Sequence, residues 1–179
     1  MTSGGRSWRR RRTVRSKPFR TRSTTLASTA TPTETPETVS PGTLRLLLFA
    51  VAGTVYGCDI GAVREIVPLR HTTRLPGAPP YVRGLINLRG AIVTVIDLAV
   101  RLTGGGTPDE GSVVLAEFGN KNVGLAVDEV RDVQLLAPQQ FEPATGDIAR
   151  GKIVRGLGHL DSGVVIVLEV PAVIRQVMA

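Results

Sequence analysis

Cysteine and aromatic residues are scarce in this sequence. A single cysteine, Cys58, among 179 residues excludes an internal disulfide and a metal site built from several cysteines. Because Cys58 lies in an apolar run, it is expected to be a small buried hydrophobic residue. Aromatic residues make up only 4% of the chain, so the predicted core is aliphatic. The longest apolar stretch, residues 46–58, is shorter than the roughly 20 residues that a membrane-spanning helix needs.

The motifs of the common catalytic and cofactor sites are also missing. Gly151-Lys152 is followed by Ile153 rather than Ser or Thr, so it is not a phosphate-binding loop, and no Gly-x-Ser-x-Gly elbow occurs. The two histidines lie far apart near turn signals and are expected to be solvated loop residues: His71 and His159. Single acids at the ends of predicted strands are expected to be solvated or to cap turns: Asp59, Asp97, Asp128 and Glu169. No catalytic residue, metal ligand or cofactor is predicted, and an enzyme would need a site of a new kind.

Net positive charge is confined to the first part of the chain. Residues 1–42 carry nine Lys or Arg and two Glu, and so account for the whole net charge of +7. The remaining 137 residues carry 13 basic and 13 acidic side chains. A neutral body has no overall charge that favours nucleic acid, so such binding would belong to the first segment.

Residues 1–42 are predicted to be a disordered basic tail. They are rich in Arg, Ser, Thr and Pro and show no hydrophobic periodicity. Three interpretations stay open: a basic arm that binds nucleic acid or anionic surfaces, an organellar transit peptide, or a true start further along the chain at Val39.

The body, residues 43–179, is predicted to be all-β. Short apolar runs alternate with turn signals, which is typical of a β-barrel or a β-sandwich. Helical signals are weak, at 97–102, at 138–141 and from Pro171 onward, where proline suits a first helical turn. Strands are predicted at 44–51, 54–59, 63–69, 84–88, 91–97, 112–118, 121–127, 130–136, 152–157 and 164–169.

An internal duplication runs through the body. Residues 56–66 align with 123–133 at an offset of 67 and share a glycine, spaced aliphatic residues and an Arg-acid pair. Residues 84–98 align with 156–170 at an offset of 72, so the second copy has five more residues between the blocks. Two similar halves predict two similar small barrels. Each half has about 65 residues, which is marginal for stability alone, so we expect a shared hydrophobic interface with one groove between the halves.

One hairpin in the body has the features of a binding surface. Asn87-Leu88-Arg89-Gly90 lies between two apolar runs, and Arg-Gly is expected to form a tight turn. Arg89 is then either the solvated residue of an ordinary hairpin or an arginine on a rigid tip that makes forked hydrogen bonds to a partner. Spacing alone favours the first interpretation and leaves the second open.

These segments resemble the CheW family of chemotaxis coupling proteins over roughly residues 43–177. The most specific match is Gly84-Leu85-Ile86-Asn87-Leu88-Arg89-Gly90 together with the strand that follows it. The resemblance implies two five-stranded SH3-like β-barrels around a shared hydrophobic core, with short helices. It also implies a non-enzymatic adaptor in the cytoplasm, recruited to receptor arrays at the membrane. Its partners would be the CheW-like regulatory domain of the histidine kinase CheA and the cytoplasmic tip of a chemoreceptor.

The resemblance also implies the two binding sites. Kinase binding is expected at Ile60, Val63 and Glu65, because an apolar and acidic strand edge suits an interface. Val63 can equally be a core residue, since the alternation along the strand allows it. Receptor binding is expected at Asn87 and Arg89, in or beside the groove between the barrels, because an apolar groove suits an amphipathic helix. Nucleic acid is expected to bind only through residues 1–42, and no membrane insertion is expected.

Overall fold

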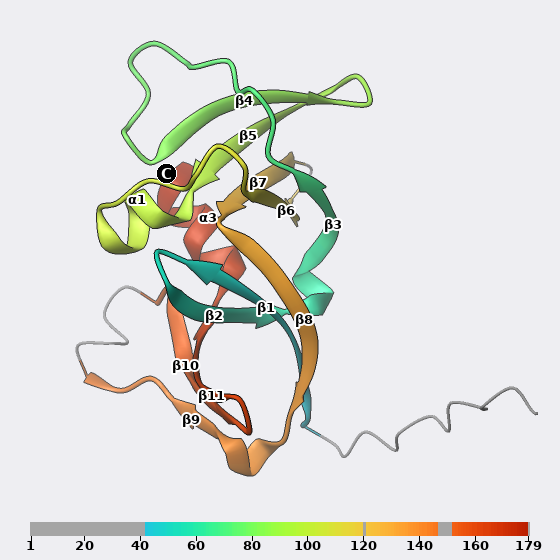
Figure 1. The fold of residues 1–179 in the computed structure, drawn as a ribbon, viewed down its shortest axis with the longest axis vertical. Helices are drawn as coiled ribbons and strands as arrows, with labels where there is room; N and C mark the ends of the chain where they lie inside the picture. The colour runs from blue at the N-terminus through green and yellow to red at the C-terminus, as the bar shows by residue number, and fades with distance from the viewer. Residues whose placement is uncertain (1–41, 120, 147–151, 179) are drawn as a thin grey trace, which may run out of the picture. The chain divides into compact units, whose positions relative to one another are not determined.

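The computed structural model of the protein describes residues 42–119, 121–146 and 152–178 and folds them into two β-sheets (Figure 1). One sheet has six strands in the order β8-β1-β2-β11-β10-β9, and the other has five in the order β3-β6-β7-β5-β4. Both curl into SH3-like barrels, so the predicted all-β fold class is confirmed, although the six-stranded sheet has one strand more than the five that the resemblance implied. The strands are β1 (Leu44–Val51), β2 (Thr54–Asp59), β3 (Val63–Pro68), β4 (Val82–Leu88), β5 (Ala91–Asp97), β6 (Ser112–Phe118), β7 (Lys121–Val127), β8 (Glu129–Leu136), β9 (Phe141–Pro143), β10 (Val154–Leu160) and β11 (Gly163–Leu168).

The two barrels share a hydrophobic core with helix α3 (Val170–Met178). The largest cluster of buried side chains combines Phe49 of β1, Leu125 of β7 and Ile174 of α3, each at most 1% exposed. Each barrel also has an interior cluster of its own, which includes Val95 in the five-stranded sheet and Val167 in the six-stranded sheet. Figure 1 shows α3 between the two sheets, and the shared core predicted from the sequence is confirmed.

The two halves of the duplication exchange strands. β11 pairs in parallel with β2, with Ile166 opposite Tyr56, and β5 pairs in parallel with β7, with Thr94 opposite Val123. The two pairs are equivalent, because their members are related by the same offsets of 72 and 67 that the sequence shows. Two barrels are therefore present as predicted, but neither is built from one half alone.

The short helices follow their predicted positions. α1 (Leu98–Thr103) begins after Asp97, whose side chain accepts the Val100 N–H at 3.1 Å. η2 covers Pro138–Gln140, and α3 begins one residue before Pro171. A further turn, η1 (Ile60–Ala62), was not predicted. Within the described part of the chain, no helix is long and apolar enough to cross a membrane.

The second half departs most from the predicted strands. β9 was not predicted; it is only three residues long and pairs with β10. β10 begins two residues later than predicted and ends three residues later. His159 consequently lies on a strand and not in a loop, with its Nε2 3.4 Å from Glu142 Oε2.

Gly84 and Gly156 are equivalent residues that other backbone approaches closely. Each lies at an irregularity of its hairpin, and a Cβ would meet Thr73 O at 2.5 Å at Gly84 and Glu142 O at 2.2 Å at Gly156. We expect Gly156→Ala to lower the thermal unfolding midpoint by roughly 2–12 °C, because overpacking costs about 1–3 kcal/mol. Circular dichroism during heating measures this. Gly106→Ala, where a Cβ meets nothing within 4 Å, is the matched control, and equal midpoints for both variants would contradict the close approach.

Candidate functional site

A forked ion pair joins the edge strands of the five-stranded barrel. β3 and β4 lie at opposite ends of this sheet, and Arg89 at the tip of the β4–β5 hairpin reaches Glu65 on β3. Arg89 Nη1 donates to Glu65 Oε2 at 3.0 Å, and Nη2 donates to Oε1 at 2.6 Å. Two parallel hydrogen bonds between a guanidinium and a carboxylate fix the orientation of both groups. We call this place, between β3 and the β4–β5 tip, the first seam.

The hairpin tip that carries Arg89 is a tight turn, as predicted. Leu88 lies opposite Ala91, which leaves only Arg89 and Gly90 in the turn. Their φ angles of +52° and +86° are both left-handed, the pattern of a type I′ hairpin turn. The Gly90 N–H donates to Asn87 Oδ1 at 2.9 Å, so Asn87 holds the turn from within the hairpin.

Residues that the sequence assigned to two separate sites therefore come together. The Arg89 side chain is 76% exposed and the Glu65 side chain 31% exposed. Ion pairs this exposed contribute about 0–1 kcal/mol to stability, so the main effect of the pair is to orient its two side chains. Within the described residues, the hydrogen bonds of Arg89 run to β3 of its own barrel and none runs to the second barrel.

Ile60 and Val63 lie where the edge strand begins. Both are half-buried and pack against the shared core, so each offers only part of its surface to a partner. Exposure alternates along β3, which sets Val63 and Glu65 on one face and Arg64 on the other. Arg64 donates to Glu117 Oε2 at 2.7 Å. The core interpretation of Val63 thus holds for the part of its side chain that packs inward, and the interface interpretation stays a prediction.

A hollow of about 360 Å³ lies along the first seam. Paired backbone hydrogen bonds of 2.8 Å between Thr73 and Leu85 lie at this hollow, and the Arg89–Glu65 pair lies further along the seam. The lining is more apolar than polar: Val67, Pro68, Leu85, Ile86 and Leu88 contribute to it together with Arg70, His71, Thr73 and Asn87. An apolar side chain of a partner therefore fits close to the hairpin that presents Arg89.

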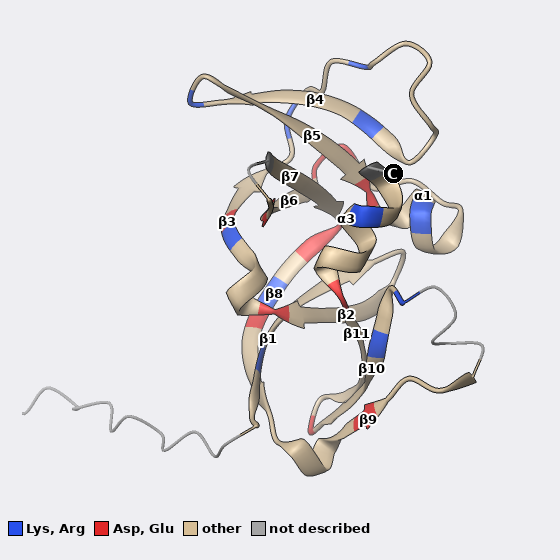
Figure 2. Ribbon diagram, turned by 180° about the vertical axis from the view of Figure 1, so that it is seen from behind, with Lys and Arg blue, Asp and Glu red and all other residues tan. Residues whose placement is uncertain are grey.

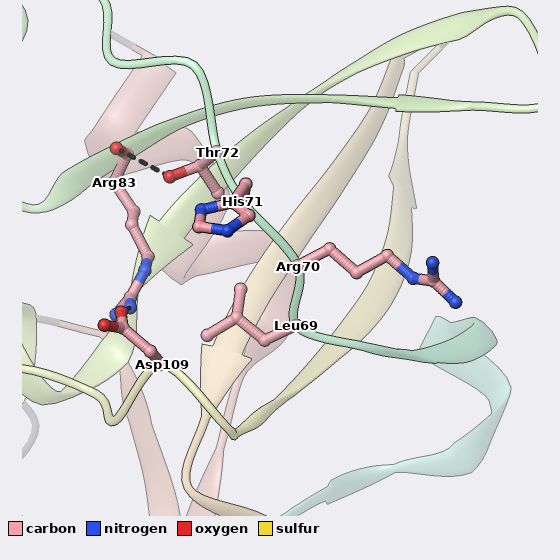
Figure 3. Close-up of a pocket in the computed structure, with 6 residues that line it drawn as sticks. All are labelled: Leu69, Arg70, His71, Thr72, Arg83 and Asp109. Atoms are coloured by element: carbon pink, nitrogen blue, oxygen red, sulfur yellow. Dashed lines mark hydrogen bonds and ion pairs between the residues drawn. The ribbon is translucent and has the colours of Figure 1, made fainter.

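A buried polar cluster joins β4, β5 and the chain that follows α1. Arg83 Nη1 donates to Asp97 Oδ2 at 3.0 Å and to the Thr107 carbonyl at 2.6 Å. Thr107 Oγ1 donates to Asp97 Oδ1 at 2.8 Å, and Asp97 is only 4% exposed. Figure 3 shows the Arg83 guanidinium beside the Asp109 carboxylate, with which it also pairs, while Arg70 points away. The capping role predicted for Asp97 is confirmed, but the solvated role is wrong.

This cluster could not be predicted from the sequence as a unit. The only signals were the single acid Asp97 at a strand end and the basic residue Arg83 before a glycine. Because the carboxylate and the guanidinium satisfy each other, the cluster holds the fold together and leaves no free group for catalysis.

Cys58 has the inert role expected from the sequence. It is 0% exposed, and burial, followed by the charge of Asp59, raises its pKa to about 12. The thiol is therefore neutral near pH 7, and it is neither a ready nucleophile nor a ready metal ligand. Within residues 42–119, 121–146 and 152–178, no group of three or more His, Cys, Asp or Glu is placed to hold a metal ion.

Two SH3-like barrels that present an arginine at an exposed hairpin tip and an acid on a strand edge have the features of a scaffold protein. A sequence profile of the CheW-like domain matches residues 45–178, and the chain belongs to this family. The resemblance seen in the sequence is thereby confirmed, and the protein is a non-enzymatic adaptor of chemotaxis-type signalling.

Individual relatives agree with this assignment. The chemotaxis protein CheW of Klebsiella aerogenes is 36% identical over 128 residues, which cover 69% of this chain and 77% of that protein. A probable chemotaxis protein CheW of Rhizobium etli is 30% identical and covers 78% of this chain and 93% of its own length. The crystal structure of the scaffolding protein TtCheW from Thermoanaerobacter tengcongensis matches with a TM-score of 0.64 and 30% identity, covering 72% of this chain and 86% of that one.

The comparisons give no support to the alternative of a tail-mediated binder of nucleic acid or anionic surfaces. The family profile begins at residue 45. The predicted basic tail lies, except for Gly42, outside the residues that the structure describes.

Proposed function

We propose that this protein couples a chemoreceptor to the histidine kinase CheA by binding both. In this proposal, the CheW-like regulatory domain of CheA binds the β3 edge at Ile60, Val63 and Glu65. The receptor tip binds beside Asn87 and Arg89. The observation that carries the proposal is the forked ion pair of the first seam, because it connects the two surfaces directly.

In this proposal the ion pair couples binding at one surface to binding at the other. Glu65 belongs to the kinase surface and Arg89 to the receptor surface, and each fixes the orientation of the other. A partner that draws Arg89 away from β3 leaves Glu65 free to turn toward the kinase. Binding at one surface then changes the free energy of binding at the other, and the effect is reciprocal.

The receptor surface suits the tip of a helical hairpin. The hollow along the first seam accepts an apolar side chain, and Arg89 beside it offers N–H donors to a carboxylate or carbonyl group. In this proposal residues 43–179 form the adaptor domain, separate from the tail, and the protein works in the cytoplasm at receptor arrays on the membrane.

Coupling itself is tested by a bridging experiment with the full chain. An immobilised receptor fragment should retain the CheA regulatory domain only when this protein is added. Retention without the protein, or no retention with it, would contradict the proposal.

We expect Glu65→Arg to weaken binding of the CheA regulatory domain by about tenfold or more, because it places a positive charge opposite Arg89 and removes the acid from the strand edge. Calorimetric titration of the purified variant against that domain measures the change. Arg64→Ala is the matched control. It alters the residue directly before Glu65 on β3, whose side chain faces the other way and pairs with Glu117. Unchanged affinity in a folded Glu65→Arg variant would place the kinase surface elsewhere.

A further inference from the structure

The second barrel has a seam equivalent to the first, and that seam is open. A hollow of about 390 Å³ lies between β8 and the tip of the β10–β11 hairpin. Leu48 and Val165, each 3% exposed, and the half-buried Val55 provide an apolar floor. The rest of the lining comes from Arg131, Asp132 and Gln134 of β8 and from the hairpin residues Ser162, Gly163 and the 57% exposed Val164.

The duplication shows what is different here. At the offset of 67, Asp132 is the counterpart of Glu65, and at the offset of 72, Asp161 is the counterpart of Arg89. The carboxylate of the first seam has an arginine opposite it, whereas the second seam has an acid in both equivalent positions. In Figure 2 the tip of the β4–β5 hairpin is accordingly blue and the tip of the β10–β11 hairpin is red.

The residues around the two seams also differ: polar acceptors in the first barrel correspond to apolar residues in the second. In the first barrel Arg64 pairs with Glu117 and reaches Asn122 at 3.4 Å. The counterparts of these two acceptors in the second barrel are Ala50 and Val55. The two polar acceptors are thus replaced by apolar residues, of which Val55 belongs to the floor of the hollow. Arg131, the counterpart of Arg64, lines the hollow, and its Nε has Glu129 at 4.0 Å as an ion-pair partner.

The hairpin tips differ in backbone as well as in charge. The β10–β11 turn has Leu160 opposite Gly163, and it is Gly163, with φ +125°, that adopts the left-handed conformation there. Asp161 therefore does not occupy the strained position that Arg89 occupies in the first turn. Asp132 accepts a hydrogen bond from Gln134 Nε2 at 2.9 Å but has no ion pair among the described contacts.

We propose that this second seam, lined by Leu48, Val55, Asp132, Val164 and Val165 and flanked by Asp161 in the hairpin turn, docks a segment of a partner protein that presents a Lys or Arg beside an apolar side chain. The partner's cation takes the place beside Asp132 that Arg89 fills beside Glu65 in the first barrel. Its apolar neighbour covers the floor at Val55 and packs against the exposed Val164. This surface lies on the second barrel and is a third contact, beyond the kinase and receptor surfaces proposed above.

The test uses the ¹⁵N-labelled full chain and two blocked tripeptides, acetyl-Val-Arg-Val-amide and acetyl-Val-Glu-Val-amide. The arginine peptide should shift backbone amide signals of β8 and of the β10–β11 tip. Raising the salt concentration should weaken the binding of this peptide. The double variant Asp132→Asn/Asp161→Asn should lower its affinity about tenfold, which corresponds to about 1.4 kcal/mol. Val164→Ser, at an exposed position, should lower the affinity while leaving the fold intact.

Glu142→Gln is the matched control, since it removes an exposed acid from the neighbouring strand β9 without touching the hollow. It should leave the affinity for the arginine peptide unchanged. Signal shifts confined to other surfaces, equal binding of the two peptides, or full affinity in the Asp132→Asn/Asp161→Asn variant would each overturn the proposal. None of these outcomes depends on CheA or a receptor, so the proposed adaptor function is judged separately.

Discussion

Asp97→Ala should lower the free energy of unfolding by about 3–5 kcal/mol, because removing one partner of a buried ion pair leaves the other charge uncompensated. Asp97 is 4% exposed, and the side chain of its partner Arg83 is 17% exposed. The same carboxylate caps α1 at Val100 and accepts hydrogen bonds from both the backbone N–H and the hydroxyl group of Thr107. In a domain of this size, such a loss lowers the thermal midpoint by roughly 10 °C.

Two further variants separate the causes of this loss. Asp97→Asn keeps an acceptor for the Val100 and Thr107 N–H groups but removes the charge that faces Arg83, so its stability should lie between those of the wild type and Asp97→Ala. Asp109→Ala removes the other acid on Arg83, and because that side chain is 98% exposed, stability should hardly change. Urea unfolding followed by circular dichroism measures all three variants. Equal losses for Asp97→Ala and Asp109→Ala would contradict the burial that we assign to the first pair.

Strand positions could be predicted where apolar alternation and turn residues act together, as in β1, β2, β5, β6 and β7. β9 escaped prediction because three residues that end in Pro143 carry no period, and β9 owes its existence to pairing with β10 at the sheet edge. The exchange of strands between the halves could not be predicted, for a different reason. An alignment of two copies records which strands are equivalent, but it does not record which copy supplies the neighbour of each strand.

The candidate residues of the site could be named from the sequence, but their arrangement in space could not be predicted. The Arg-Gly turn follows from local chemistry, and the tight turn that carries Arg89 was found where the sequence placed it. The partner of Arg89 could not be predicted, since Glu65 is 24 residues away and reaches it only when the barrel closes. The burial of Asp97 could not be predicted for the same reason. Its position at the end of a predicted strand indicated a capping role, but its burial depends on contacts with Arg83 and Thr107 that form only in the folded chain.

Arg89→Ala should weaken binding of the receptor tip by about ten- to hundredfold, since a hydrogen bond to a charged group contributes about 1.5–3 kcal/mol and each 1.4 kcal/mol is one decade. The side chain is 76% exposed beside a hollow that is more apolar than polar, so its remaining N–H donors are available to a partner. Binding of the CheA regulatory domain should change less, because Glu65 stays in place and loses only its orienting partner. Titration of the variant against a receptor fragment and, separately, against the regulatory domain measures both affinities.

The left-handed backbone at Arg89 determines which control variants are suitable. Its φ of +52° is left-handed, a conformation that is strained for Arg and Ala alike because both carry a Cβ. Arg89→Asn removes the guanidinium but tolerates this backbone, and it should lose as much receptor affinity while keeping the thermal midpoint. Arg89→Lys keeps the charge without the fork and should recover only part of the affinity. Full receptor binding by a folded Arg89→Asn variant would show that Arg89 serves the hairpin alone, and the receptor surface would then have to lie elsewhere on the barrels.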